Sequence, residues 1–133
     1  MIGKSVPRVD AYEKVTGRAK FTDDMILDKC LVAKVCHATI GNGIVKSIDT
    51  SEAEALDGVV KVVTFKDVPN HCYPTPGHPW SVELAHQDVA DRNLLTGRVR
   101  YYGDDIAAVV AEDEVTASRA LKLIKVEYEE YPV

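Results

Sequence analysis

The last third of the chain constrains the fold most, because it reads as a strand, a helix and a second strand in direct succession. The apolar run at residues 106–111 predicts a buried strand. Asp113 then provides a helix N-cap. Apolar residues follow at the spacing of one helix face: Ala117, Ala120, Leu121 and Ile124. Val126 and Tyr128 alternate with glutamates, which predicts a final strand with one wet face.

The middle of the chain predicts further strands. Residues 30–39 alternate in polarity, Gly41-Asn42-Gly43 is a turn signal, and residues 44–48 follow as a second strand, so we expect an antiparallel hairpin. Thr50 or Ser51 can cap a short helix, and Ser51 and Glu54 have the spacing of a capping box. Residues 59–65 are β-branched almost throughout and predict a strand covered on both faces.

Two segments lack a clear period. Residues 1–29 predict an extended N-terminal segment with turns. Residues 66–96 contain four prolines and predict a long loop, which in a compact domain is usually functional or a docking surface. A strand at residues 98–102, ended by Gly103, restores regular structure. The order of these elements predicts an α+β fold.

Composition excludes several function classes. A length of 133 residues suits one domain, and 16 basic against 21 acidic residues leave a net charge of −5 without a basic stripe, so nucleic acid is not an expected partner. No apolar run approaches the roughly 20 residues that cross a bilayer, so we expect no membrane partner and a cytoplasmic protein. Cys30, Cys36 and Cys72 are expected to stay free, the first two as half-buried residues of one strand.

Three segments together resemble the N-terminal α/β hammerhead domain of the molybdenum-binding large subunit of the xanthine dehydrogenase and aldehyde oxidase family. They are residues 8–24, residues 47–64, and residues 99–112 with the helix and strand that follow. Residues 76–80 and 88–95 make the chain most similar to the bacterial xanthine dehydrogenase branch. Asp104 stands where many relatives have glutamine, which also resembles that branch.

The resemblance implies that residues 1–133 form a single hammerhead domain, with a mixed β-sheet and two helices, cut from a longer chain. It implies a parent enzyme that hydroxylates a purine or related N-heterocycle with oxygen from water at a molybdenum–pterin centre. Electrons would leave through iron–sulfur clusters and often FAD. The implied partners are the remaining molybdenum-binding domains and the iron–sulfur and FAD subunits. We expect no catalytic, cofactor-binding or metal-binding residue in residues 1–133. This domain would instead brace the neighbouring catalytic domains and dock against them.

Other functions remain open from the residues alone. A free-standing module could bind a metal or small ligand through the loop at residues 71–86, which carries His71, Cys72, His78 and His86. The gaps between them do not match the paired ligand spacing of structural zinc sites. A carrier with a modified lysine would need a lysine on a hairpin tip, and Lys46 falls inside a predicted strand instead.

Further side chains have a possible chemical role and a plainer structural one. Lys14 and Arg18 could hold an anion, although a solvated turn is the simpler interpretation. Asp104 and Asp105 with the glutamates at 127, 129 and 130 could supply an acid/base pair, but the glutamates fit the wet face of a strand better. Trp80, on a proline-stiffened loop, is a candidate interface anchor within residues 70–96.

Overall fold

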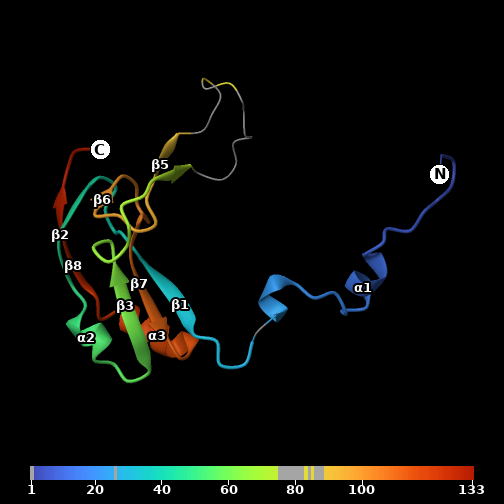
Figure 1. The fold of residues 1–133 in the computed structure, drawn as a ribbon, viewed down its shortest axis with the longest axis horizontal. Helices are drawn as coiled ribbons and strands as arrows, with labels where there is room; N and C mark the ends of the chain where they lie inside the picture. Colours follow the sequence, from blue (N-terminus) through green and yellow to red (C-terminus); the bar gives the residue numbers. More distant parts are fainter. Residues whose placement is uncertain (1, 26, 75–82, 84, 86–88) are drawn as a thin grey trace. The chain divides into compact units, whose positions relative to one another are not determined.

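A computed structural model describes residues 2–25, 27–74, 83, 85 and 89–133. The chain divides into two compact units, Met1–Cys30 and Leu31–Val133, and each is described by itself. The larger unit has the predicted α+β class, with two helices among strands of three small sheets (Figure 1). None of the described helices is long and apolar enough to cross a membrane.

The smaller unit contains two short helices where the sequence predicts only extended segments and turns. They are α1, Ala11–Val15, and a single 3-10 turn, η1, Thr22–Asp24. Asp10 forms an ion pair with Lys14 at 2.8 Å, and Gly17 ends α1 with a φ of 69°. Helical i,i+4 charge pairing therefore overrides the absent hydrophobic period. Neither helix buries a residue, so the prediction failed for lack of an apolar face.

The first sheet is built around β7, Asp105–Ala111, as the apolar run predicts. This strand lies between β1, Val32–His37, and β3, Val59–Thr64, and pairs antiparallel with both. Helix α3, Glu114–Leu121, packs against the sheet (Figure 1). The buried side chains between them are small: Ala53, Val62, Val109, Ala111, Ala117 and Ala120. The alanines let the helix approach the sheet closely.

The second sheet corrects the predicted hairpin. Strand β2, Gly43–Asp49, pairs antiparallel with β6, Arg98–Val99, and β8, Lys125–Glu130, while β1 belongs to the first sheet. Gly43 shows the reason, because a Cβ built on it would lie only 2.3 Å from the Glu129 carbonyl oxygen. The glycine turn thus carries the chain across to β8 instead of back along β1.

Helix caps were predicted with mixed success. Asp113 caps α3 as expected, since its Oδ1 accepts a hydrogen bond from the Thr116 N–H at 2.9 Å. Helix α2, Ser51–Glu54, exists, but the capping box of Ser51 and Glu54 does not form. Asp49 accepts from the Ser51 N–H at 3.0 Å instead, and the Glu54 side chain accepts from the Thr50 hydroxyl. The preceding aspartate competes successfully for the same donor.

Two strand predictions need correction. Strand β3 is an edge strand, and its Val60 is 54% exposed, so it is not covered on both faces; β7 takes that central place. The loop at 66–96 contains a two-stranded sheet of β4, Tyr73–Pro74, and β5, Ala90–Arg92. Pro74 fits because so short a ladder needs few backbone donors.

Every strand pair that the structure describes is antiparallel, so three small sheets replace one mixed sheet.

The strand predicted at residues 98–102 is shorter than expected. Strand β6 ends at Val99, and Tyr101 and Tyr102 lie in a turn that Gly103 closes with a φ of 93°. Both tyrosines are exposed, so they do not pack within a strand as the sequence suggests. Cys30 likewise precedes β1 and is exposed, whereas Cys36 is half-buried as predicted.

Candidate functional site

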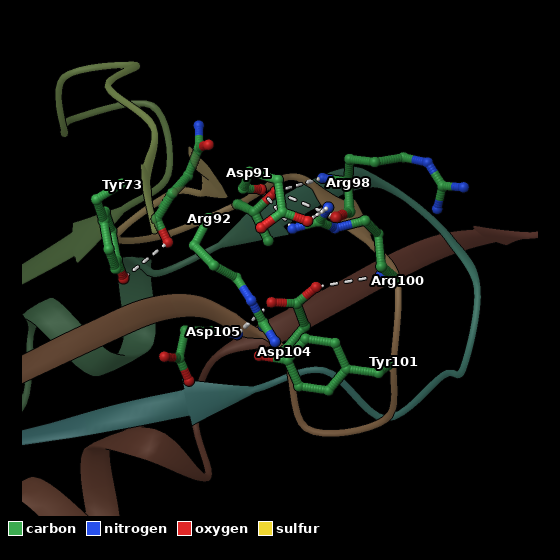
Figure 2. A pocket seen from close by; sticks show the side chains of 10 residues that line it. Tyr73, Asp91, Arg92, Arg98, Arg100, Tyr101, Asp104 and Asp105 are labelled. Atoms are coloured by element: carbon green, nitrogen blue, oxygen red, sulfur yellow. Dashed lines mark hydrogen bonds and ion pairs between the residues drawn. The ribbon is translucent and has the colours of Figure 1, made fainter. Parts of the chain in front are cut away.

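One concavity of the larger unit is lined mostly by polar side chains and has a volume of about 270 Å³. We call it the polar hollow. Strands β4 and β5, the start of β7 and the turn after β6 contribute its principal side chains (Figure 2). Those used below are Tyr73, Asp91, Arg92, Arg98, Arg100, Tyr101, Asp104 and Asp105. Three arginines and three aspartates are among its lining residues, so the hollow is close to charge-neutral.

Asp104 organises the turn between β6 and β7. Its side chain is 6% exposed, and its two carboxylate oxygens accept hydrogen bonds from the Arg100 N–H at 3.1 Å and the Asp105 N–H at 3.2 Å. The Asp104 carbonyl accepts from the Ala38 N–H at 2.8 Å, which ties the turn to the end of β1. A buried carboxylate that satisfies two backbone donors holds the turn in one conformation.

Arg100 closes one wall of the hollow. Its Nη1 lies 2.9 Å from Asp91 Oδ2, and its Nη2 donates to the Asp91 carbonyl oxygen at 2.6 Å. The forked guanidinium therefore grips both the side chain and the backbone of β5. Both side chains are more than 40% exposed, so the ion pair contributes at most about 1 kcal/mol to stability. Its role is to position β5 beside the turn.

Arg92 reaches across the hollow to the turn. Figure 2 shows its side chain extending toward Tyr101 and Asp104, and its Cζ lies 4.7 Å from the centre of the Tyr101 ring. Polar contact with the Tyr101 side chain, and then the charges of Asp91 and Asp104, raise the pKa of Arg92 above its ordinary value. The guanidinium is thus a permanent cation stacked on an aromatic face.

Arg98 lies at the border of the hollow, and its guanidinium donates hydrogen bonds to groups outside the hollow. It donates to the Gly43 carbonyl oxygen at 2.9 Å and to Asn42 Oδ1 at 2.8 Å. It also donates to the Val99 carbonyl oxygen, and its Cζ lies 5.5 Å from the centre of the Tyr131 ring. These contacts join β6 to the turn before β2 and to the residues after β8.

The hollow has the chemistry of a recognition or bracing surface. Asp105 Oδ1 lies 2.9 Å from His37 Nδ1, which gives one imidazole–carboxylate pair at the margin of the hollow, with both side chains largely exposed. The groups within it form ion pairs and hydrogen bonds with each other. In the described ranges no three His, Cys, Asp or Glu side chains gather as a group that could hold a metal ion.

The histidine and cysteine candidates are only partly described. His71 is exposed and irregular, and the Cys72 thiol donates to Asn93 Oδ1 at 3.1 Å, where β5 ends. His78, Trp80 and His86 lie outside the described residues. Of the four residues proposed as metal ligands at 71–86, the structure therefore describes only His71 and Cys72. Cys72 is a free thiol beside the polar hollow.

The remaining candidates have structural partners. In the smaller unit Lys14 pairs with Asp10, and the Arg18 guanidinium lies 5.9 Å from the Tyr12 ring centre. Glu127 accepts from the Ser47 hydroxyl at 2.9 Å across β8 and β2, apart from the aspartates of the hollow. Lys46 lies within β2, as the sequence predicts.

The sequence analysis did not identify the arginines of the hollow. Arg92, Arg98 and Arg100 lie within nine residues of the chain, on both sides of Gly97, and this concentration of arginines is the signal that was available. Their aspartate partners could not be assigned, because Asp91 precedes a loop and Asp104 follows a turn. Only folding brings those segments together.

Comparison with known proteins places these features in a family. A family model for the aldehyde oxidase and xanthine dehydrogenase a/b hammerhead domain matches residues 16–132. The xanthine dehydrogenase molybdenum-binding subunit of Escherichia coli O157:H7 is 45% identical over 126 residues, covering 95% of this chain and 17% of the relative. The chain therefore spans about one sixth of that relative's length.

Solved structures agree with the sequence match. Quinoline 2-oxidoreductase from Pseudomonas putida 86 superposes with a TM-score of 0.83 at 31% identity, over 98% of this chain and 16% of its own. The aldehyde oxidoreductase from Desulfovibrio desulfuricans gives 0.79 at 34% identity, over 98% and 15%. Identity is thus higher to the xanthine dehydrogenase subunit than to either of these, in agreement with the predicted branch.

Proposed function

The chain belongs to the aldehyde oxidase and xanthine dehydrogenase a/b hammerhead family, and from that premise we propose that it is the bracing and docking domain of a molybdenum hydroxylase large subunit. The observation that carries the proposal is the family match over residues 16–132 combined with high coverage of this chain and low coverage of its relatives. We assign residues 1–133 as one such domain within a longer parent chain.

The parent enzyme is proposed to hydroxylate a purine or a related N-heterocycle, because the similarity to a xanthine dehydrogenase subunit is high. A molybdenum–pterin centre would supply transfer of an oxygen atom derived from water. Iron–sulfur clusters, and FAD in a further subunit or domain, would carry the electrons away. We propose a cytoplasmic location for the assembly.

The described residues of this chain do not fit those cofactors. No three metal-ligating side chains gather among them, and the three cysteines are free thiols, with Cys36 in β1, Cys30 before β1 and Cys72 before β4. The polar hollow is lined by arginines and aspartates, among them the ion pair of Arg100 and Asp91. As the family resemblance implies, we propose that the cofactor ligands lie in the remainder of the parent, and we assign no catalytic residue to this domain.

The domain's own contribution is mechanical. Two buried clusters, one under α3 and one between the sheets, hold β7 rigidly. Asp104 holds the turn at residues 100–104 at the start of β7, and Arg100 joins that turn to strand β5 through Asp91. An exposed surface with arginines and tyrosines held in place has the composition of protein interface anchors. The neighbouring molybdenum-binding domains or the iron–sulfur subunit are the proposed partners.

The proposal is tested on the natural gene product. The gene is expressed with the coding sequence that follows Val133, in a host that makes the pterin cofactor. The product is assayed for bound molybdenum and for xanthine-dependent dye reduction. We expect molybdenum and turnover in that product, and neither in a matched preparation of residues 1–133.

A parent product without molybdenum or purine turnover would contradict the proposal. Stoichiometric zinc in the 133-residue chain, with loss of zinc on changing His71 and Cys72 to alanine, would favour a free-standing metal-binding module. Among the described residues no observation favours that alternative.

A further inference from the structure

The residues that follow the last strand are held by hydrogen bonds to the backbone and side chain of Asn42, although chain ends normally fray. Strand β8 ends at Glu130. The Tyr131 N–H then donates to the Asn42 carbonyl oxygen at 3.0 Å, and the Pro132 carbonyl accepts from Asn42 Nδ2 at 2.6 Å. Val133 is exposed, and the match to the hammerhead family model ends at residue 132.

Asn42 is matched to both of its neighbours. Its Oδ1 accepts from the Arg98 guanidinium, which has only donors, while its Nδ2 donates to the Pro132 carbonyl, which can only accept. The orientation of the amide is therefore determined by its partners. Aspartate would keep the first contact and lose the second, because it has no N–H to offer.

Arg98 anchors this arrangement to the body of the domain. Its guanidinium bonds Gly43 and Asn42 and lies over the Tyr131 ring, so one side chain of β6 contacts both the turn before β2 and the segment after β8. The arrangement is stiff along the chain as well, because Pro132 fixes its own φ and restricts the backbone of Tyr131. The apolar clusters of the unit include none of these three residues.

We propose that Asn42, Arg98 and Tyr131 form an exit clamp, which sets the direction in which the polypeptide leaves this domain and couples it rigidly to the next domain of the parent. This inference rests on the proposed function, since it requires a following domain. The contacts of Asn42 and Arg98 with residues 131–132 lie outside the apolar clusters. Because they hold successive residues after β8, they can fix the orientation of the following domain relative to this one. A bracing domain needs such a joint, because a free linker would let it rotate away from its neighbour.

The test uses the full parent chain and the variant Asn42→Asp. Hydrogen–deuterium exchange is followed by mass spectrometry with fragmentation, at Tyr131 and in the residues just after Val133. We expect exchange in both places to rise about 10-fold, because a second carboxylate oxygen would face the Pro132 carbonyl and release the exit. Exchange in strands β2 and β8 is expected to stay unchanged.

Controls separate the clamp from general effects. Asn70→Asp is the matched substitution, since Asn70 Oδ1 accepts from Asn93 Nδ2 at 2.7 Å and aspartate retains that acceptor. It should leave exchange around Tyr131 unchanged. Tyr131→Leu, which removes the ring beneath Arg98, should reproduce the effect of Asn42→Asp, and Tyr131→Phe, which keeps the ring, should not.

Two results would overturn the inference. If exchange rose at Tyr131 but not beyond Val133, the contacts would be local and would not couple domains. If exchange rose throughout the domain, Asn42 would be a general stabilising residue. Molybdenum content, measured on the same preparations, tests the proposed function separately, because the exchange readout does not depend on the metal.

Discussion

The two ends of β7 are closed in different ways. At the C-terminal end, Val109 and Ala111 pack beneath α3 in a cluster of small apolar side chains. At the N-terminal end, Ile106 packs with Ala38, Ile40 and Val99, which come from loops, a turn and a two-residue strand. Above that second cluster lie the charged groups of the polar hollow. One strand thus joins a core under a helix to a core that strands β2 and β8 and several loop residues close; we call these the helix-covered end and the loop-covered end.

The two ends of β7 therefore contribute differently: one stabilises the domain, and the other exposes side chains that a neighbouring protein could contact. The helix-covered end is stabilised by periodic apolar residues and a helix cap. The loop-covered end depends on Asp104 and Arg100 to hold turns in place, and it presents arginines and tyrosines to a neighbour. Docking surfaces are commonly carried by loops on a rigid scaffold for this reason.

The largest expected effect comes from the apolar part of the loop-covered end. Ile106→Ala should lower the free energy of unfolding of the 133-residue chain by about 2–5 kcal/mol, because it leaves a cavity under fully buried neighbours. Urea denaturation followed by circular dichroism measures it. Val60→Ala, at an exposed position of β3, serves as the control and should change little. A small loss for Ile106→Ala would mean that the second cluster is not a true core.

The next effect concerns the polar part of the same end. Asp104→Ala should cost about 1–3 kcal/mol, because two backbone N–H groups lose their acceptor in a buried site. Asp104→Asn keeps one acceptor oxygen and should cost less. The same urea titration compares them. Equal stability of all three proteins would show that water replaces the carboxylate and that the turn does not depend on it.

A smaller effect distinguishes the helix-covered end by pH. Hydrogen bonds from the Thr116 hydroxyl and N–H lower the pKa of Asp113 below its ordinary 3.8. Stabilisation by the ionised Asp113 is therefore complete above pH 3.8 and is lost as the pH falls through the lower, folded-state value. Asp113→Asn keeps the cap without titrating, so its stability deficit at neutral pH should vanish in acid. A deficit independent of pH would contradict this assignment.

The smallest effect involves reactivity rather than stability. Burial raises the pKa of the Cys36 thiol, which packs against the second cluster, whereas Cys30 is exposed. Iodoacetamide at mildly alkaline pH should therefore alkylate Cys30 several-fold faster than Cys36, as judged by peptide mass spectrometry. In concentrated urea the two rates should converge. Equal rates in the folded protein would show that β1 opens readily at this end.

Prediction from the sequence succeeded where one segment carries the whole signal. Strand β7, the Asp113 cap, α3 and β8 follow from local periodicity and local hydrogen bonding, and the resemblance to the hammerhead family rests on segments in the same order. It failed where competing partners are distant. The hairpin of β1 and β2 was wrong because β7 pairs with β1, and the capping box was wrong because Asp49 accepts the Ser51 N–H first.

The amino-acid order alone determined the α+β class, the presence of a buried strand at residues 106–111 and the family, since each depends on patterns within short windows. Only the tertiary structure decided which strands pair, that Arg92 stacks on Tyr101, and that Asn42 and Arg98 hold the exit of the chain. Those contacts join residues far apart in sequence, and hydrogen-bond donors and acceptors of similar chemistry become partners only when the backbone brings them together.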